Sequence, residues 1–191
     1  MNIAGVDEAG RGPLAGPVVC AAVILPRHDG LLGLDDSKKL TAKDRDRLFQ
    51  QILSVALAYS IVRIEASTID RINILQATMS GMAKAVSELP ITPDLVLIDG
   101  NRVPAELPCQ AHAIIGGDAI ERCIMAASVL AKVRRDRIML ELHREYPVYG
   151  FDMHKGYPTA THLQALASYG ACPQHRRSYK PVQKVIALHA L

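Results

Sequence analysis

Two adjacent acidic residues near the N-terminus, Asp7 and Glu8, have the types and the setting to do chemistry. They follow a short apolar run and lead into the glycine-rich loop Gly10-Arg11-Gly12, after which a second apolar run begins at Val18. Glycine-rich loops can bind phosphate, but the glycine spacing here differs from the G-x-G-x-x-G fingerprint of dinucleotide sites. Paired carboxylates beside a phosphate make chemical sense with a divalent cation between them, because their hard oxygens suit Mg²⁺ or Mn²⁺. The stretch therefore indicates either a solvated acidic turn or part of a metal site.

Two further acids lie where they can join this pair. Asp99 follows the apolar run Leu95–Ile98, and Asp118 follows Gly116-Gly117 at the start of a long helical pattern. Ligands of open α/β sheets bind beyond the carboxyl ends of strands, so the four acids are predicted to converge. Crowded carboxylates repel one another without a cation, whereas two metal ions ~4 Å apart relieve the repulsion and support phosphodiester hydrolysis. The four acids therefore predict a two-metal nuclease site.

Strand geometry sets one condition on this site. Successive side chains of a strand point to opposite faces, so Asp7 and Glu8 serve one site only if the backbone turns at the strand end. Gly10 would permit that turn, because glycine adopts backbone angles that other residues avoid.

The surrounding pattern predicts the elements that carry these acids. Runs rich in apolar and β-branched residues predict strands over residues 2–6, 18–25, 58–64, 95–98 and 111–115. Apolar residues at helical spacing predict helices over residues 41–53, 73–88, 116–146 and 159–169. This order predicts an α/β fold with a mixed five-stranded sheet flanked by helices. We expect one domain over residues 1–191, with roughly 137–191 as a helical C-terminal lobe.

Composition is that of an ordinary globular protein, with 49% hydrophobic and 21% charged residues among 191. No apolar run is long enough for a membrane span and no secretory leader opens the chain, so a cytoplasmic location without membrane contact is predicted. The four cysteines are scattered, which disfavours a zinc site or a disulfide framework. From Lys132 onward there are ten Lys and Arg against four Asp and Glu, whereas acids outnumber bases before it. This asymmetry predicts a polyanion-binding surface beside an acidic core.

Several basic residues are candidate phosphate contacts. They are Lys38, Lys39, Lys155, Arg176 and Arg177. Each one alone is more typical of a solvated surface charge. Tyr157 lies between a glycine and a proline on a constrained turn, where its ring could contact a sugar. His154, His162 and His175 lack a metal-ligand spacing and are not predicted to bind metal.

Taken together, these motifs resemble the bacterial ribonuclease HII family, the type 2 ribonucleases H. The matching blocks, in family order, are Asp7–Val19, Asp36–Leu40, Ile98–Asn101, Gly117–Asp118, Ala126–Val133, Arg135–Asp136, Tyr149–Phe151, His154–Thr159, His175–Ser178 and Pro181–Val182. Departures from the family pattern are mild: Gly116 stands where a lysine is common, Val129 where an isoleucine is and Tyr179 where a phenylalanine is.

The resemblance implies a ribonuclease H-like fold and Mg²⁺- or Mn²⁺-dependent cleavage of the RNA strand of RNA–DNA hybrids, with 5′-phosphomonoester products. It also implies incision 5′ of single ribonucleotides embedded in duplex DNA. The catalytic and metal-binding residues it implies are Asp7, Glu8, Asp99 and Asp118. It assigns recognition of the 2′-hydroxyl to Gly10, Arg11 and Gly12, and of the ribonucleotide–deoxyribonucleotide junction to Tyr157. The other expected substrate-binding residues are Ser37, Lys38, Lys39, Lys155 and Arg176.

Two other functions remain open from the residues alone. A metal-dependent DNA nuclease or resolvase of the same fold would share the acids but would not need Gly10-Arg11-Gly12 and Tyr157. A non-catalytic nucleic-acid-binding module would use the basic C-terminal region, although four acids would then repel the ligand. Two Phe and no Trp also disfavour a single-strand binder that stacks bases. The protein is expected to be a monomer whose partners are RNA–DNA hybrid and ribonucleotide-containing duplex DNA.

Overall fold

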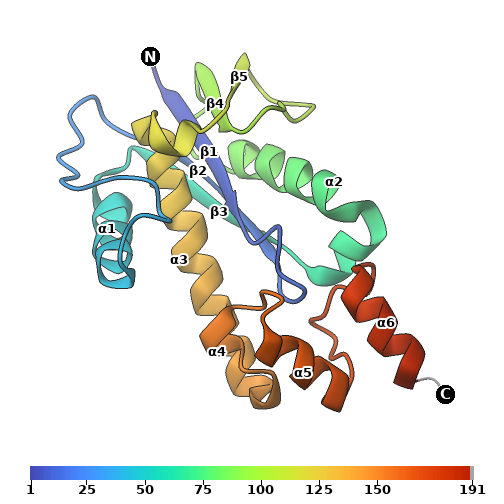
Figure 1. The fold of residues 1–191 in the computed structure, drawn as a ribbon. Coiled ribbons are helices and arrows are strands. Elements are labelled where there is room, and N and C mark those ends of the chain that lie inside the picture. Colours follow the sequence, from blue (N-terminus) through green and yellow to red (C-terminus); the bar gives the residue numbers. More distant parts are fainter. Residues whose placement is uncertain (190–191) are drawn as a thin grey trace.

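The computed structural model describes residues 1–189 and confirms the mixed five-stranded sheet, with strand order β3-β2-β1-β4-β5 (Figure 1). The strands are β1 (Ile3–Ala9), β2 (Val18–Ile24), β3 (Ala58–Ile64), β4 (Leu95–Asp99) and β5 (Ala111–Ile114). The helices are α1 (Ala42–Val55), α2 (Ala66–Ser87), α3 (Arg122–Glu145), α4 (Phe151–His154), α5 (Ala160–Tyr169) and α6 (Lys180–His189). None of these helices combines the length and the apolar character needed to cross a bilayer.

Strand β1 lies at the centre of the sheet. It pairs antiparallel with β2 on one side and parallel with β4 on the other. Because Val6 lies opposite Ile98 in the parallel pair, β1 and β4 end at the same edge of the sheet. The acids that follow these two positions, Asp7, Glu8 and Asp99, therefore reach that edge from neighbouring strands.

Helices cover both faces of the sheet. Helix α3 packs on β1 and β2, with α1 against α3, whereas α2 packs on β2 and β3. Alternate residues of β2 face the two layers: Val19 and Ala21 pack with α1 and α3, and Cys20 and Ala22 pack with α2. All seven residues of β2 are buried, as expected of a strand covered on both faces.

The start of α3 lies unusually close to β1. A Cβ atom at Gly5 would lie only 2.1 Å from the Cys123 carbonyl carbon and 2.3 Å from the Ile124 nitrogen. Both are main-chain atoms that cannot rotate away. Only glycine at this position lets α3 settle onto the strand that carries Asp7.

Helix α2 is longer than predicted, because it begins at Ala66 rather than Asn73. Asn73 interrupts it with non-helical backbone angles, φ 67° and ψ 164°. Its side-chain Oδ1 accepts a hydrogen bond from the Gln76 N–H at 3.0 Å, as a helix N-cap does. The predicted helix is therefore the part after the kink, and the short segment before it carries too few apolar positions to show a helical period.

Helix α3 also starts later than predicted. Gly116 adopts a left-handed conformation with φ 69°, and Gly117–Ala119 form a short 3₁₀ turn. Helix α3 then begins at Arg122. Asp118 thus lies on a separate turn ahead of the helix, which lets its side chain face the sheet edge.

The C-terminal helices are joined by three buried histidines from different segments. Residue 137, at which we expect the helical C-terminal lobe to begin, lies inside α3. This helix continues to Glu145, and the smaller helices follow it. His162 Nε2 lies 3.1 Å from His175 Nε2, and the ring of His154 stacks on that of His162 with centroids 4.4 Å apart. Burial lowers the pKa of His175 to about 4, so the ring stays neutral at neutral pH. The cluster connects α4, α5 and the segment ahead of α6.

Candidate active site

Three of the four predicted acids come together at the shared end of β1 and β4. One carboxylate oxygen from each of Asp7, Asp99 and Asp118 lies within 4.8 Å of the other two. Asp7 and Asp118 are buried, with 4% and 6% of their surface exposed. The Asp118 N–H donates to Asp99 Oδ1 at 3.3 Å, which ties the 3₁₀ turn to the end of β4.

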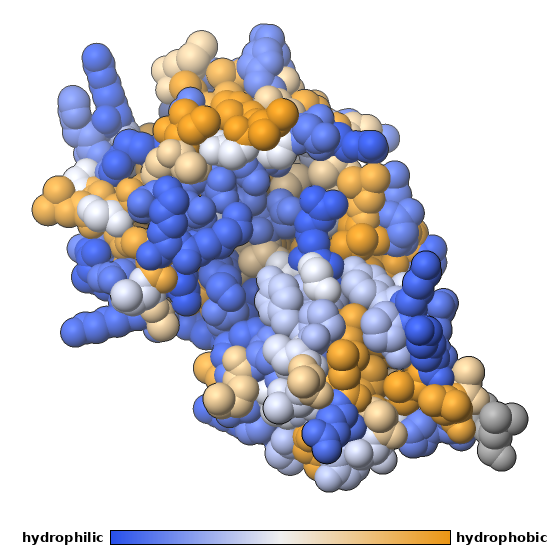
Figure 2. Space-filling model, in the orientation of Figure 1, coloured by the Kyte–Doolittle hydropathy of each residue, from blue (hydrophilic) through white to orange (hydrophobic). Residues whose placement is uncertain are grey.

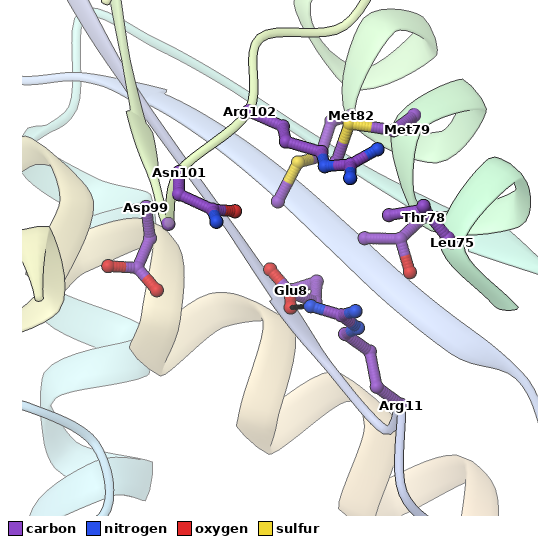
Figure 3. Close-up of a pocket in the computed structure, with 10 residues that line it drawn as sticks. Glu8, Arg11, Leu75, Thr78, Met79, Met82, Asp99, Asn101 and Arg102 are labelled. Carbon is purple, nitrogen blue, oxygen red and sulfur yellow. Dashed lines mark ion pairs between the residues drawn. The ribbon is translucent and has the colours of Figure 1, made fainter. Parts of the chain in front are cut away.

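Glu8 lies beside this group of three, close enough for its charge to raise the pKa of Asp7. The strand continues through Ala9, so the backbone does not turn between the two adjacent acids and their side chains alternate. Figure 3 shows Glu8 next to Arg11, with Glu8 Oε1 3.5 Å from Arg11 Nη1. Of the four predicted acids, three therefore form one close group, and Glu8 lies alongside it, where it lines a cavity with Asp7 and Asp99. Glu8 still shares two adjoining cavities with Asp99.

The electrostatics of the group fit a bound divalent cation. Burial raises the pKa of Asp7 well above its ordinary value, and the charges of Glu8 and Asp99 raise it further. Burial also raises the pKa of Asp99, with Asp118 adding to the effect, and burial is the main cause of the raised pKa of Glu8. Carboxylates that resist ionisation together are stabilised by a positive charge among them. Three convergent oxygens from separate elements are the hard donors that Mg²⁺ and Mn²⁺ prefer.

The loop ahead of α1 brings a cation to the edge of this group. Lys38 Nζ lies 2.7 Å from Asp118 Oδ2, and that hydrogen bond raises the pKa of Lys38. Ser37 is buried, and its hydroxyl lies 2.8 Å from the Ser128 hydroxyl of α3. Arg45 of α1 stabilises this loop, because its Nη1 donates a hydrogen bond to the Ser37 carbonyl oxygen at 2.8 Å. Ser37 and Lys38 therefore border the acids.

The glycine-rich loop and Tyr157 line one cavity with the acids. This cavity, of about 450 Å³, is lined by Asp7, Glu8 and Asp99 together with the residues predicted to recognise the ribonucleotide. The latter are Gly10, Arg11, Gly12 and Tyr157. A Cβ atom at Gly12 would lie 3.5 Å from Tyr157 Cε1, so the ring stands beside the loop. Figure 2 shows a hydrophilic, hollowed area across the middle of this face of the molecule.

Five residues of this cavity were not among the predicted site residues. They are Ala9, Arg45, Ser128, Lys132 and Arg135. Lys132 and Ser128 project from the same face of α3, four residues apart, and Lys132 Nζ lies 2.8 Å from Asp136 Oδ1. A helical-face argument applied to the block around Ala127 could have found both, whereas Arg45 is recognisable only once the loop it holds is seen.

Two predicted phosphate contacts lie away from the acids. Lys39 is exposed and its Nζ lies 3.1 Å from Asp35 Oδ1. Lys155 adopts a left-handed backbone conformation with φ 50°, and its Nζ donates to the Asp152 carbonyl oxygen. Lys155 borders a second cavity that adjoins Arg45 rather than the acids. Both remain candidate contacts for nucleic acid beyond the reacting phosphate.

Arg176 does not match the prediction of a phosphate contact. It is 0% exposed, and its guanidinium donates to main-chain carbonyl oxygens of the glycine-rich loop. A side chain enclosed in this way cannot meet a phosphate at the surface. The basic C-terminal segment made Arg176 look like a surface residue, because nothing in the local sequence shows that its partners lie 160 to 166 residues earlier.

Comparison with known proteins agrees with this geometry. The family model described as Ribonuclease HII matches residues 4–182. The ribonuclease HII of Xanthomonas campestris is 58% identical over 187 residues, covering 97% of this chain and 78% of that protein. The crystal structure of ribonuclease H2 from Pyrococcus horikoshii superposes with a TM-score of 0.85 at 28% identity, covering 100% of this chain and 99% of that one. The structure of the PCNA:RNase HII complex from Archaeoglobus fulgidus gives a TM-score of 0.78 at 25% identity, covering 94% and 96%. The chain belongs to the ribonuclease HII family and is a metal-dependent ribonuclease H.

Proposed function

We propose that the protein hydrolyses the RNA strand of RNA–DNA hybrids and incises 5′ of single ribonucleotides embedded in duplex DNA. The observation that carries this proposal is the shared cavity, which is lined by three acids, a glycine-rich loop and an exposed tyrosine. A nuclease without sugar selectivity would need only the acids. A loop of small residues at the same cavity supports recognition of a sugar, because glycine lets the main chain approach a ligand closely.

The proposed metal ligands are Asp7, Asp99 and Asp118, with Glu8 and Asp99 positioned to share a second Mg²⁺ or Mn²⁺. Bound cations would polarise a water and neutralise charge on the scissile phosphate. The chain's own residues hold this arrangement in place. Asp118 is kept at the group by its N–H bond to Asp99, and Lys38 supplies a positive charge beside it.

Recognition of the ribonucleotide is proposed to rest on the main chain of Arg11 and Gly12. Both residues are exposed, and neither backbone N–H has a hydrogen-bond partner among residues 1–189. A protein distinguishes RNA from DNA at one position by contacting the 2′-hydroxyl, which accepts such hydrogen bonds. Tyr157, 44% exposed, is proposed to stack against the adjoining deoxyribose. Lys39 and Lys155 are proposed to contact phosphates further along the duplex.

We also propose that residues 1–191 form one catalytic domain with a helical C-terminal portion that acts as a monomer in the cytoplasm. Support comes from the single sheet, which both helical layers share. Sedimentation of the free protein and of its complex with duplex measures the oligomeric state, and a dimer in either would overturn that part.

The testing experiment is a cleavage assay on duplex DNA carrying one ribonucleotide, with all-DNA duplex and EDTA as controls. We expect Mg²⁺- or Mn²⁺-dependent incision 5′ of the ribonucleotide and no cut in the all-DNA duplex. Cleavage of both duplexes would favour a DNA nuclease of the same fold. Binding without any cleavage would favour a non-catalytic module.

Arg11→Ala is expected to reduce the rate of incision at a single ribonucleotide by about tenfold or more, while affinity for duplex changes by less than about threefold. The expected size follows from losing one charge-assisted contact between the Arg11 side chain and the substrate, which is worth about 1.5–3 kcal/mol. In the free protein the Arg11 guanidinium faces Glu8, so its removal also changes the charge beside the metal site. Arg144→Met, a charge loss at an exposed position near the end of α3, is the matched control. Equal losses of incision and of duplex affinity would mark Arg11 as a plain phosphate contact.

A further inference from the structure

Two arginines are the largest fully buried side chains of the described protein, although they carry full charges. Arg135 of α3 is 1% exposed and Arg176 is 0% exposed. Neither guanidinium pairs with a carboxylate anywhere in residues 1–189. Burying a charge without a countercharge is costly, so the hydrogen bonds that these two side chains make must offset that cost.

Both guanidiniums donate only to neutral oxygens, and most of those belong to one loop. Arg176 donates through Nε to Gly16 O at 3.1 Å, through Nη1 to Arg11 O at 2.8 Å and Tyr179 Oη at 3.0 Å, and through Nη2 to Gly10 O at 2.5 Å. Arg135 donates through Nε to Pro17 O at 3.1 Å, through Nη1 to Lys155 O at 3.0 Å and through Nη2 to Ala15 O at 3.2 Å. Five carbonyl groups of residues 10–17 are thereby drawn inward.

Because these carbonyl groups point into the protein, the geometry of the peptide unit determines where the neighbouring N–H groups point. A peptide unit is planar and trans, so its C=O and N–H point in opposite directions. The Gly10 carbonyl shares its unit with the Arg11 N–H, and the Arg11 carbonyl shares its unit with the Gly12 N–H. By holding those two carbonyls in the interior, Arg176 aims the two N–H groups at the cavity.

The fit between loop and guanidinium is close enough to exclude side chains. A Cβ atom at Gly10 would lie 2.0 Å from Arg135 Nε and 2.4 Å from Arg135 Cδ, so the loop rests directly on this side chain. The planar fork of arginine reaches several carbonyls at fixed angles, which a lysine ammonium cannot do. Tyr179 Oη adds a second donor to Arg11 O at 2.8 Å.

We propose that Arg176, supported by Arg135, is a positioning residue for ribonucleotide selectivity: it sets the peptide planes whose N–H groups meet the 2′-hydroxyl. This rests on the proposed function of the loop. Arg176 touches no substrate and acts through Gly10 and Arg11.

The test compares Arg176→Met and Arg176→Lys with wild type and with Arg144→Met, the exposed control. For Arg176→Met we expect kcat/KM at a single ribonucleotide to fall about 100-fold, the size seen when one pre-aimed donor is lost. Affinity for all-DNA duplex stays within about threefold, because no surface charge is removed. Arg176→Lys keeps the charge but lacks the fork, so we expect it to recover less than a tenth of the lost activity.

A second readout is independent of cleavage. In amide NMR spectra of Arg176→Lys, the Arg11 and Gly12 N–H resonances are expected to shift or broaden, while those of β1 residues before Asp7 stay in place. If Arg176→Met does not fold, the proposal is tested on Arg176→Lys alone, by kcat/KM at a single ribonucleotide and by the Arg11 and Gly12 amide resonances. Full activity of Arg176→Lys, or unchanged Arg11 and Gly12 resonances, would overturn the proposal. Failure of wild type to select the ribonucleotide would instead overturn the proposed function, and the resonances would still test whether Arg176 orders the loop.

Discussion

Asp7→Asn is expected to abolish metal-dependent cleavage and, in the metal-free protein, to raise thermal stability. Loss of one ligand removes several kcal/mol of charge stabilisation at the reacting phosphate, which corresponds to a rate at least about 1,000-fold lower. The same substitution removes a buried carboxylate that the fold disfavours in its ionised form. Function and stability therefore move in opposite directions at this position.

The sign of the stability change follows from proton linkage. The pKa of Asp7 is raised in the folded state, so between its unfolded value of about 3.9 and its folded value the native protein binds more protons than the unfolded chain. Stability contributed by this group is present at low pH and is lost as pH rises through the folded pKa. Asparagine does not titrate, so the advantage of the variant over wild type should be absent near pH 4 and present at pH 7.5.

Thermal melts in EDTA at these two pH values measure the effect. We expect the melting temperature of Asp7→Asn to exceed that of wild type by a few degrees at pH 7.5, since about 1 kcal/mol shifts a domain of this size by about 2–4 °C. Glu141→Gln, at an exposed position on α3, is the control and should change neither stability nor cleavage. Added Mn²⁺ should stabilise wild type and not the variant, because only a native site gains from the ligand. A variant that melts below wild type in EDTA at pH 7.5 would contradict the electrostatic account.

Gly5→Ala is expected to give the largest loss of stability of any single methyl addition in β1. The new Cβ would lie 2.1 Å from a main-chain carbon of α3, so strand or helix must shift as a body. Overpacking of this kind costs about 3 kcal/mol or more, which lowers the melting temperature by about 6 °C or more. Cleavage should fall as well, because α3 carries Ser128 and Lys132 to the cavity.

Gly12→Ala is the matched control for stability. Its new Cβ would make only an ordinary 3.5 Å contact with Tyr157, and Gly12 does not have a positive φ. We expect its melting temperature to stay within about 2 °C of wild type, as for most surface substitutions. A Gly5→Ala protein that melts as high as Gly12→Ala would show that α3 can move off β1 at little cost.

The sequence predicted those features that depend on short-range pattern. Asp7 and Asp99 were placed together because apolar runs identify their strands and ligands of α/β sheets bind beyond the carboxyl ends of strands. The structure has these two strands as parallel neighbours that end at one edge of the sheet. The alternation of Asp7 and Glu8 was foreseen as a difficulty, and Glu8 lies beside the close group of three acids rather than within it. Those inferences needed only the period of a strand.

Features set by distant contacts were not predicted. The segment of α2 ahead of Asn73 is helical although its own apolar pattern is short, because Ile69 is buried in a cluster with Val18 and Ala77. The interior position of Arg176 depends on carbonyl groups at the other end of the chain. No local pattern distinguishes a basic residue whose partners are main-chain oxygens from one that faces solvent.

The contact between Arg176 and the loop after β1 has a consequence for the order in which the protein matures. All four acids are synthesised by residue 118, so an emerging chain holds every proposed metal ligand while the donors to Gly10 and Arg11 are still missing. The chain is synthesised from its N-terminus, so selectivity then waits for the segment around Arg176 to be made and to dock. A nascent or truncated chain that ends before Arg176 has the proposed metal ligands but lacks the guanidinium that orders the glycine-rich loop. Such a chain therefore lacks the proposed basis for selecting the cleavage position.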